Sequence, residues 1–169
     1  MKVRGVKMMK RGFTMLELLI VITVMAIVAT LATGAAVSSI KQGRRKRIQV
    51  TVQALNTAVE CYHSRQGAWP FSVRKLRHLP DVDAATEKVK ISDKAILAPM
   101  YAALYQEGYL DGSGLLCVTD SGARKPLNKI SRSSPETFQI CYVRVEDSSE
   151  IGFFKMTYNF ITDSVSFSE

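Results

Sequence analysis

The sequence predicts an α+β fold in which one long N-terminal helix, membrane-spanning in its first half, packs on a small C-terminal antiparallel sheet. Three observations lead to this prediction. Residues 18–37 form an apolar run of twenty positions without a charge. Residues 48–62 then carry apolar side chains at helical spacing, and residues 137–168 alternate apolar and polar side chains as strands do.

The positive charge of the chain is concentrated in two clusters. The net charge is +8, and five basic residues lie within the first eleven without an acid. After residue 47 the chain has 13 basic and 14 acidic residues, so this remainder is nearly neutral. The composition therefore does not indicate a general affinity for nucleic acid. The second cluster follows the apolar run and consists of Lys41, Arg44, Arg45, Lys46 and Arg47.

The apolar run has the length of a membrane helix. Twenty helical residues rise about 30 Å, which matches the hydrocarbon core of a bilayer. One acid, Glu17, lies directly before the run. It can reach the interface or interact with the positive end of the helix dipole, or it can take a positive partner inside the membrane.

A specific motif surrounds this acid. The basic leader ends at Gly12 and is followed by the run FTMLELLIV at residues 13–21. This segment resembles the class III signal of type IV pilins and type II secretion pseudopilins. The resemblance implies cleavage after Gly12, N-methylation of Phe13 and retention of the helix for polymerisation. It also places Glu17 at the fifth mature position, where the acid neutralises the N-terminal amine of a neighbouring subunit.

The resemblance also implies the organisation and location of the chain. Residues 1–12 form the leader, residues 13–66 the stalk helix and residues 67–169 a periplasmic head. Within the stalk, residues 13–40 serve membrane insertion and assembly, and residues 41–66 are amphipathic. The helix crosses the inner membrane once with a cytoplasmic N-terminus. Charge does not decide this orientation, because five basic residues lie on each side of the run.

The partners implied are those of a filament subunit. A prepilin peptidase/N-methyltransferase processes the chain, and other pilin or pseudopilin subunits polymerise with it. The lipid bilayer surrounds the helix before assembly. An inner-membrane platform protein, and indirectly an assembly ATPase, supply the work.

Two features of the stalk have alternative interpretations. Gly34 lies about where relatives carry a helix-loosening proline, but glycine weakens a helix by about 1 kcal/mol rather than about 3. It predicts local loosening or close packing of helices at a small residue. The basic cluster at residues 41–47 fits anionic lipid headgroups or acids on a neighbouring subunit. DNA binding is less favoured, because no aromatic residues interleave the cluster.

The amphipathic half of the stalk is predicted to end at Gly67, shortly before Pro70. In the head, residues 72–79 and 99–108 are predicted as short helices, and residues 81–94 as a loop. Strands are expected at residues 115–118, 137–145, 154–160 and 165–168, the last three as a meander. The apolar stripe of the stalk is expected to cover this sheet. The stripe consists of Ile48, Val52, Leu55, Val59 and Tyr62.

The three cysteines allow one disulfide in an oxidising compartment. Cys117 and Cys141 both fall in predicted strands and form the preferred pair. Cys61 lies beside the apolar stripe and is expected to be a buried free thiol. A Cys61–Cys117 pairing is the alternative.

No catalytic constellation is apparent in the sequence, so the chain is not expected to be an enzyme. His63 and His78 are expected to be solvated, and no cofactor is predicted. Calcium is an alternative for the acidic turns, because some pseudopilins bind it there; a solvated turn is the favoured interpretation. The acidic residues in question are Glu146, Asp147, Glu150 and Asp163.

The predicted function is structural: a pseudopilin of a type II secretion system, assembled into a short filament for protein secretion. Tyr62, Gly67, Trp69 and Pro70 resemble the Tyr…Gly-x-x-Pro ending of pseudopilin stalks. A minor type IV pilin for adhesion, twitching motility or DNA uptake is the first alternative. A soluble binding protein, exported by an ordinary signal peptide cleaved before Val37, is the second.

Overall fold

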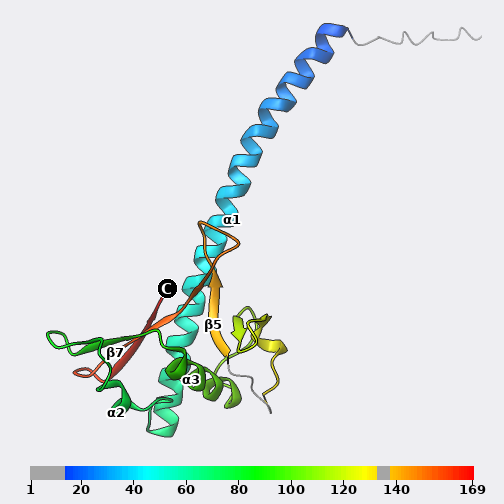
Figure 1. The fold of residues 1–169 in the computed structure, drawn as a ribbon. Helices are drawn as coiled ribbons and strands as arrows, with labels where there is room; N and C mark the ends of the chain where they lie inside the picture. The colour runs from blue at the N-terminus through cyan, green and yellow to red at the C-terminus, as the bar shows by residue number, and fades with distance from the viewer. Residues whose placement is uncertain (1–13, 133–137) are drawn as a thin grey trace, which may run out of the picture. The chain divides into compact units, whose positions relative to one another are not determined.

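The computed structural model describes residues 14–132 and 138–169. Its first element is helix α1, Met15–Gln66, which is labelled in Figure 1. The helix ends where the sequence predicts. Gly67 has a φ of 67°, and its N–H donates to the carbonyl of His63 at 2.8 Å. A glycine in this left-handed conformation closes a helix at little steric cost.

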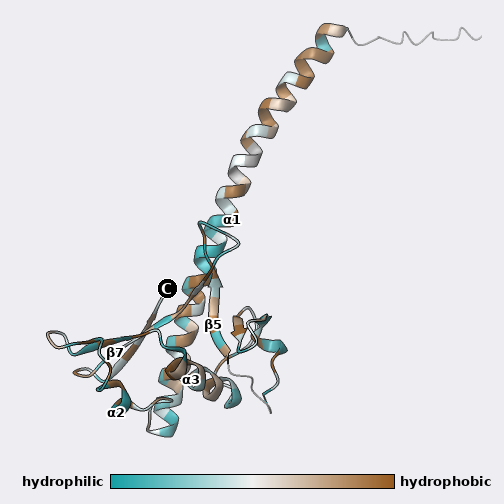
Figure 2. Ribbon diagram, viewed as in Figure 1, coloured by the Kyte–Doolittle hydropathy of each residue, from teal (hydrophilic) through white to brown (hydrophobic). Residues whose placement is uncertain are grey.

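The chain divides into two compact units, one extending to Gln42 and the other covering Gly43–Glu169. The described part of the first unit is a helical segment with mostly apolar residues, as its colouring in Figure 2 shows. The second unit, called the head unit below, contains the rest of α1 and all other elements. The long helix and the C-terminal antiparallel strands confirm the predicted α+β class.

The head unit contains two four-stranded antiparallel sheets. One has the order β1-β2-β7-β8 and the other the order β4-β3-β5-β6. The bounds of the first sheet's strands are Val82–Asp83, Lys88–Ile91, Lys155–Asn159 and Ser164–Ser168. Those of the second are Arg124–Pro126, Leu116–Thr119, Phe138–Val143 and Ile151–Phe153. The helical elements of the head are α2 (Val73–Leu76), α3 (Lys94–Gln106) and the 3-10 turn η1 (Leu127–Lys129).

The predicted meander of three consecutive strands is wrong. Strand β5 pairs with β6, in the register Cys141↔Phe153, whereas β7 pairs with β8 and β2. Only Phe154 separates β6 from β7, and its side chain is buried. The chain therefore passes from one sheet to the other at this residue. The strand predicted at residues 154–160 corresponds to β7, and β6 was not predicted.

Two further elements differ from the prediction. Strand β2 lies in the expected loop, although Val89 and Ile91 alternate with lysines in the period of a strand. Helix α3 begins five residues before Pro99, because Asp93 caps it by accepting a hydrogen bond from Ala95 N at 2.9 Å. The predicted end of this helix at Gly108 is confirmed by a φ of 78°.

The core of the head unit forms between α1, α3 and the sheets. Leu55 and Val59 of α1 are almost fully buried, together with Tyr101 and Leu104 of α3. The predicted stripe on α1 is confirmed, since Ile48 is also buried while Val52 and Tyr62 are half-buried against the core. The edge strand β8 is tied to the same helix by a hydrogen bond from Phe167 N to Asn56 Oδ1.

Candidate assembly site

The first turn of α1 is capped by Thr14. The Thr14 side chain accepts a hydrogen bond from Glu17 N at 3.3 Å, and its carbonyl accepts one from Leu18 N at 3.2 Å. The pattern Thr-x-x-Glu is a known N-terminal signature, so the sequence held a signal for this role of Thr14. Gly12 and Phe13, the predicted processing residues, lie outside the described residues.

The carboxylate of Glu17 has no cationic partner within the described residues. The residue is exposed and lies in the first turn of α1, where the helix dipole favours a negative charge. In water this position is stable, but in hydrocarbon a lone carboxylate is costly. The geometry therefore leaves Glu17 available to a positive group outside the described part of the chain.

The helix after Glu17 presents apolar side chains in all directions. Its large apolar residues from Met15 to Ile40 are between 41% and 94% exposed. Two of its threonine hydroxyls are satisfied within the helix: Thr23 donates to the carbonyls of Leu19 and Ile20, and Thr30 to that of Ile27. By length and composition, α1 is able to cross a membrane. This surface favours lipid or other apolar helices over water.

Helix α1 continues through Gly34 without a break. A Cβ atom added at Gly34 would meet nothing within 4 Å. The predicted loosening at this glycine concerns an assembled filament and stays a prediction.

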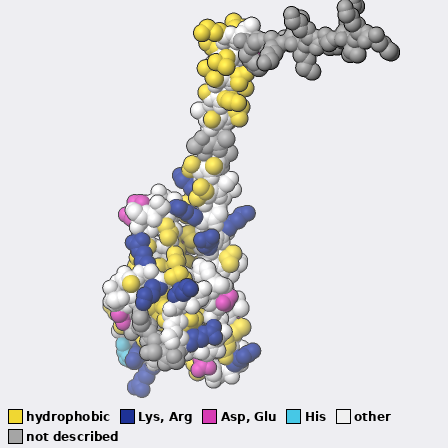
Figure 3. Space-filling view, turned by 90° about the vertical axis from the view of Figure 1, so that its right-hand side faces the viewer, with side chains coloured by type: hydrophobic (Ala, Val, Ile, Leu, Met, Phe, Trp, Pro, Cys, Tyr) yellow, Lys and Arg dark blue, Asp and Glu magenta, His cyan; other side chains and the backbone are white. Residues whose placement is uncertain are grey.

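The basic cluster lies entirely on α1. Lys41 belongs to the first unit and the other four residues to the head unit. Arg44 is half-buried, and the other members are exposed. Among the described residues, no carboxylate forms an ion pair with the cluster. Figure 3 shows Lys and Arg side chains spread over the visible face of the head unit, among apolar and acidic ones.

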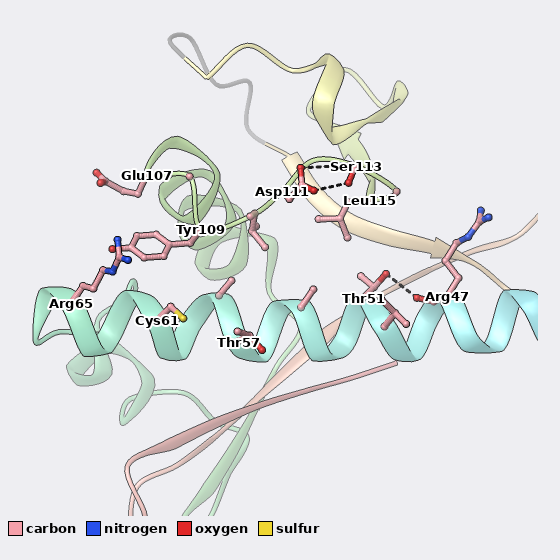
Figure 4. Close-up of a pocket in the computed structure, with 16 residues that line it drawn as sticks. Arg47, Thr51, Thr57, Cys61, Arg65, Glu107, Tyr109, Asp111, Ser113 and Leu115 are labelled. Carbon is pink, nitrogen blue, oxygen red and sulfur yellow. Dashed lines mark hydrogen bonds between the residues drawn. The ribbon is translucent and has the colours of Figure 1, made fainter.

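A groove of about 860 Å³ runs along α1 in the head unit, opposite the segment after α3. Figure 4 shows Thr57 and Cys61 on the helix side and Tyr109 and Leu115 on the opposite wall. The groove walls are largely small or apolar. Asp111, on the rim, already accepts hydrogen bonds from the backbone and hydroxyl of Ser113, which lower its pKa. No nucleophile and base are placed together among the residues that line this groove.

The predicted Cys117–Cys141 disulfide is wrong. Cys117 lies opposite Ile140 and Cys141 opposite Leu116, so the two side chains point to opposite faces of the sheet. The Cys117 thiol donates to the carbonyl of Lys125 instead. Cys61 is exposed rather than buried and forms no disulfide either. Both strands were predicted, but neither their pairing nor the register between them could be read from spacing.

The acidic turns are held by protein donors. Asp147 accepts hydrogen bonds from the hydroxyl and N–H of Ser149, which lower the pKa of its carboxyl. Glu150 forms an ion pair with Arg144 at 2.6 Å. Among the described residues, no group of three or more His, Cys, Asp or Glu side chains is arranged to hold a metal ion.

An aromatic cluster that sequence reasoning missed fastens the end of α1 to the β7–β8 turn. His63 is half-buried, not solvated, and stacks on Trp69 with ring centroids 3.9 Å apart. The Trp69 indole donates to Asp163 Oδ1 at 2.8 Å, and the Tyr158 hydroxyl donates to the same oxygen. These hydrogen bonds, first that of Tyr158, lower the pKa of Asp163. Burial, and then Asp163 itself, raises the pKa of Tyr158 to about 12.

Comparison with known proteins gives one match. Residues 7–33 match the model of the prokaryotic N-terminal methylation motif. This is the class III signal of type IV pilin-like proteins, so the resemblance predicted from residues 12–21 is confirmed. The motif supports a type IV pilin-like or pseudopilin protein, and it implies processing by a prepilin peptidase and assembly with other pilin subunits. Neither the curated proteins nor the solved structures give a significant match.

Proposed function

We propose that this chain is a structural subunit of a type II secretion pseudopilus, without enzymatic activity of its own. The observation that carries the proposal is the methylation motif joined to α1. The large apolar side chains of α1 that follow the single acid Glu17 are exposed. Such a surface has no partner within the described residues of the chain. A bilayer before assembly and the helices of neighbouring subunits after assembly would supply that partner.

In this proposal, prepilin peptidase cleaves after Gly12 and the new amine of Phe13 is methylated, which keeps its positive charge. The amine and Glu17 of a neighbouring subunit are each costly in lipid, and together they largely cancel. Their pairing sets the register of adjacent stalk helices. A cytoplasmic ATPase, acting through a membrane platform protein, supplies the work of extraction.

The proposed location is the inner membrane, with a cytoplasmic N-terminus and a periplasmic head. The hydroxyls of Thr23 and Thr30 support membrane insertion, because they are satisfied by carbonyls of their own helix. No cofactor is proposed for the acidic turns or for the groove.

A secretion pseudopilus is favoured over a type IV pilus by the end of the stalk. Gly67 closes α1, and Trp69, two residues later, is bonded to Asp163 of the head. This segment carries the Tyr62, Gly67 and Pro70 pattern that resembles pseudopilins.

The test is the intact mass and N-terminal peptide of the membrane-extracted protein, made with and without a prepilin peptidase. The expected product begins at methylated Phe13 and lacks the 12 leader residues. A product beginning near Val37 would instead establish an ordinary signal peptide and remove Glu17 from the mature chain.

Deletion of the gene then distinguishes a role in a secretion pseudopilus from a role in a type IV pilus. The pseudopilus proposal expects loss of protein secretion with normal twitching and transformation. Loss of twitching or of DNA uptake with normal secretion would assign the chain to a type IV pilus.

A further inference from the structure

A second, smaller pocket of about 240 Å³ lies in the head unit between α1 and strand β5. Figure 4 shows the Arg47 side chain leaving α1 on the side where β5 ends. The walls of this pocket combine cationic side chains from the helix with apolar and aromatic side chains from the sheet. The residues that line it include Arg44, Arg47, Ile48, Leu116, Cys141, Tyr142 and Val143.

The two arginines are positioned to bind one anion together. They are three residues apart on a helix and therefore share one face. No Asp or Glu lines the pocket, and no carboxylate of the described chain pairs with either guanidinium. Arg44 is half-buried, whereas Arg47 is exposed. The planar guanidinium fork binds phosphate in a bidentate manner, which a lysine does not reproduce.

The remaining groups of the pocket are compatible with a negative ligand. Burial raises the pKa of the Cys141 thiol to about 11 and also raises that of the Tyr142 phenol, so both stay neutral near pH 7. The Tyr142 hydroxyl thus keeps a proton to donate. Ile48 and Val143 add an apolar wall, and Leu116 is 37% exposed beside them. A ligand that carries a phosphate next to a hydrocarbon part matches this combination.

We propose that this pocket binds the phosphate of an anionic phospholipid headgroup, with Arg44 and Arg47 as its ligands. The inference rests on the proposed function, which places the uncharged run in a bilayer. Arg44 follows Val37, the last residue of that run, by seven positions. A lipid phosphate is the anion that a residue so close in sequence to the hydrocarbon boundary meets first. The role differs from diffuse attraction by the whole basic cluster, because it assigns recognition to two of its five residues.

The test uses the full chain, coexpressed with prepilin peptidase, extracted in a neutral detergent and observed by native mass spectrometry. Phosphatidylglycerol or phosphatidylethanolamine is added at equal concentration, and the fraction of protein that retains one lipid is measured. The variant Arg44→Gln/Arg47→Gln removes the two pocket charges. The matched control, Lys41→Gln/Lys46→Gln, removes two charges of the same cluster that do not line the pocket. The emission of Trp69 verifies that both variants remain folded.

The proposal expects the wild-type chain to retain phosphatidylglycerol over phosphatidylethanolamine. The pocket variant should lose that retention by about tenfold or more, because two charge-assisted hydrogen-bonding groups are removed. The control should change it by less than about twofold. Equal losses in both variants, or equal retention of the two lipids, would overturn the proposal.

Two further measurements identify the source of the anion and test the proposed pseudopilin function separately from the pocket. Glycerol phosphate, added as a soluble competitor at the lipid concentration, should not displace the lipid; displacement would assign the pocket to a free phosphate. Unchanged lipid retention with loss of filaments in the pocket variant would assign it to an acidic surface of a neighbouring subunit. The same spectra give the N-terminus, so a chain cleaved near Val37 that still retains lipid would reject the pseudopilin function and leave the pocket standing.

Discussion

Large apolar side chains behave in opposite ways in the two units of this chain. In the first unit every large apolar residue whose side chain is described is at least 41% exposed, whereas the core residues of the head unit are below 10%. The head unit buries its apolar side chains within the monomer, whereas in the proposed function lipid or neighbouring helices cover those of the first unit. The same residue types would then specify assembly in the first unit and folding in the head unit.

The contrast between the two units is tested most strongly at Glu17, the acid of the first unit. Glu17→Gln should be cleaved and methylated normally but should reduce filament recovery by about tenfold or more, because the amine of Phe13 loses its counter-charge in an apolar environment. Sheared filaments are quantified by immunoblot against total cell protein. Glu60→Gln, an exposed acid on α1 in the head unit, is the matched control and should assemble normally. Wild-type filament recovery from the Glu17 variant would reject the pairing role.

The head unit should respond to substitution through its own stability. Leu55 is 0% exposed, so Leu55→Ala removes core contacts and should lower the free energy of unfolding by about 2–5 kcal/mol. Val50, on the same helix but 62% exposed, provides the control: Val50→Ala should change it by less than about 0.5 kcal/mol. Urea unfolding of the full chain, followed by the emission of Trp69, measures both. Similar losses in the two variants would mean that the stripe on α1 does not form the core.

One kind of substitution should have opposite effects in the two units. A Cβ atom at Gly152 would overlap the ring of Tyr142, so Gly152→Ala should cost about 1–3 kcal/mol. A Cβ at Gly34 meets nothing within 4 Å, so Gly34→Ala should favour the helix by about 1 kcal/mol and leave the urea midpoint of the head unchanged. The urea transition of the head measures the first effect and helical circular dichroism the second. A destabilised helix in the Gly34 variant would contradict this contrast.

The difference between the units also explains what could be predicted from the sequence. The apolar run, the stripe on α1 and the stop at Gly67 are local patterns, and local patterns determine helices. The cap at Thr14 is equally local, and attention to the pattern Thr-x-x-Glu would have found it. The methylation motif lies in the same stretch, so the part of the chain that carries the function is the part that its sequence describes best.

The head unit resisted prediction because its decisive contacts are distant in sequence. Strand β2 pairs with β7, in the register Val89↔Tyr158, and no local pattern specifies that partner. The change of sheet at Phe154 places β6, which was not predicted, and β7 in different sheets. The register of β3 on β5 separates two cysteines that were predicted to pair because both lie in strands. A one-residue difference in register moves a side chain to the other face, and only the assembled sheet determines it.

The smallest expected effect concerns the bond that fastens the end of α1. Hydrogen bonds from Tyr158 and Trp69 hold the pKa of Asp163 below its usual range, so their contribution is complete above the pKa of an unfolded aspartate and is lost as the pH falls through the folded value. Trp69 is the single tryptophan of the chain, and its indole donates to this carboxylate. Its emission in the folded protein should therefore titrate below about pH 4. Asp163→Asn should abolish that step, whereas Asp147→Asn, at a carboxylate held by Ser149, should leave it intact. A persistent step in the Asp163 variant would show that another acid controls the environment of Trp69 and that the cluster does not depend on this bond.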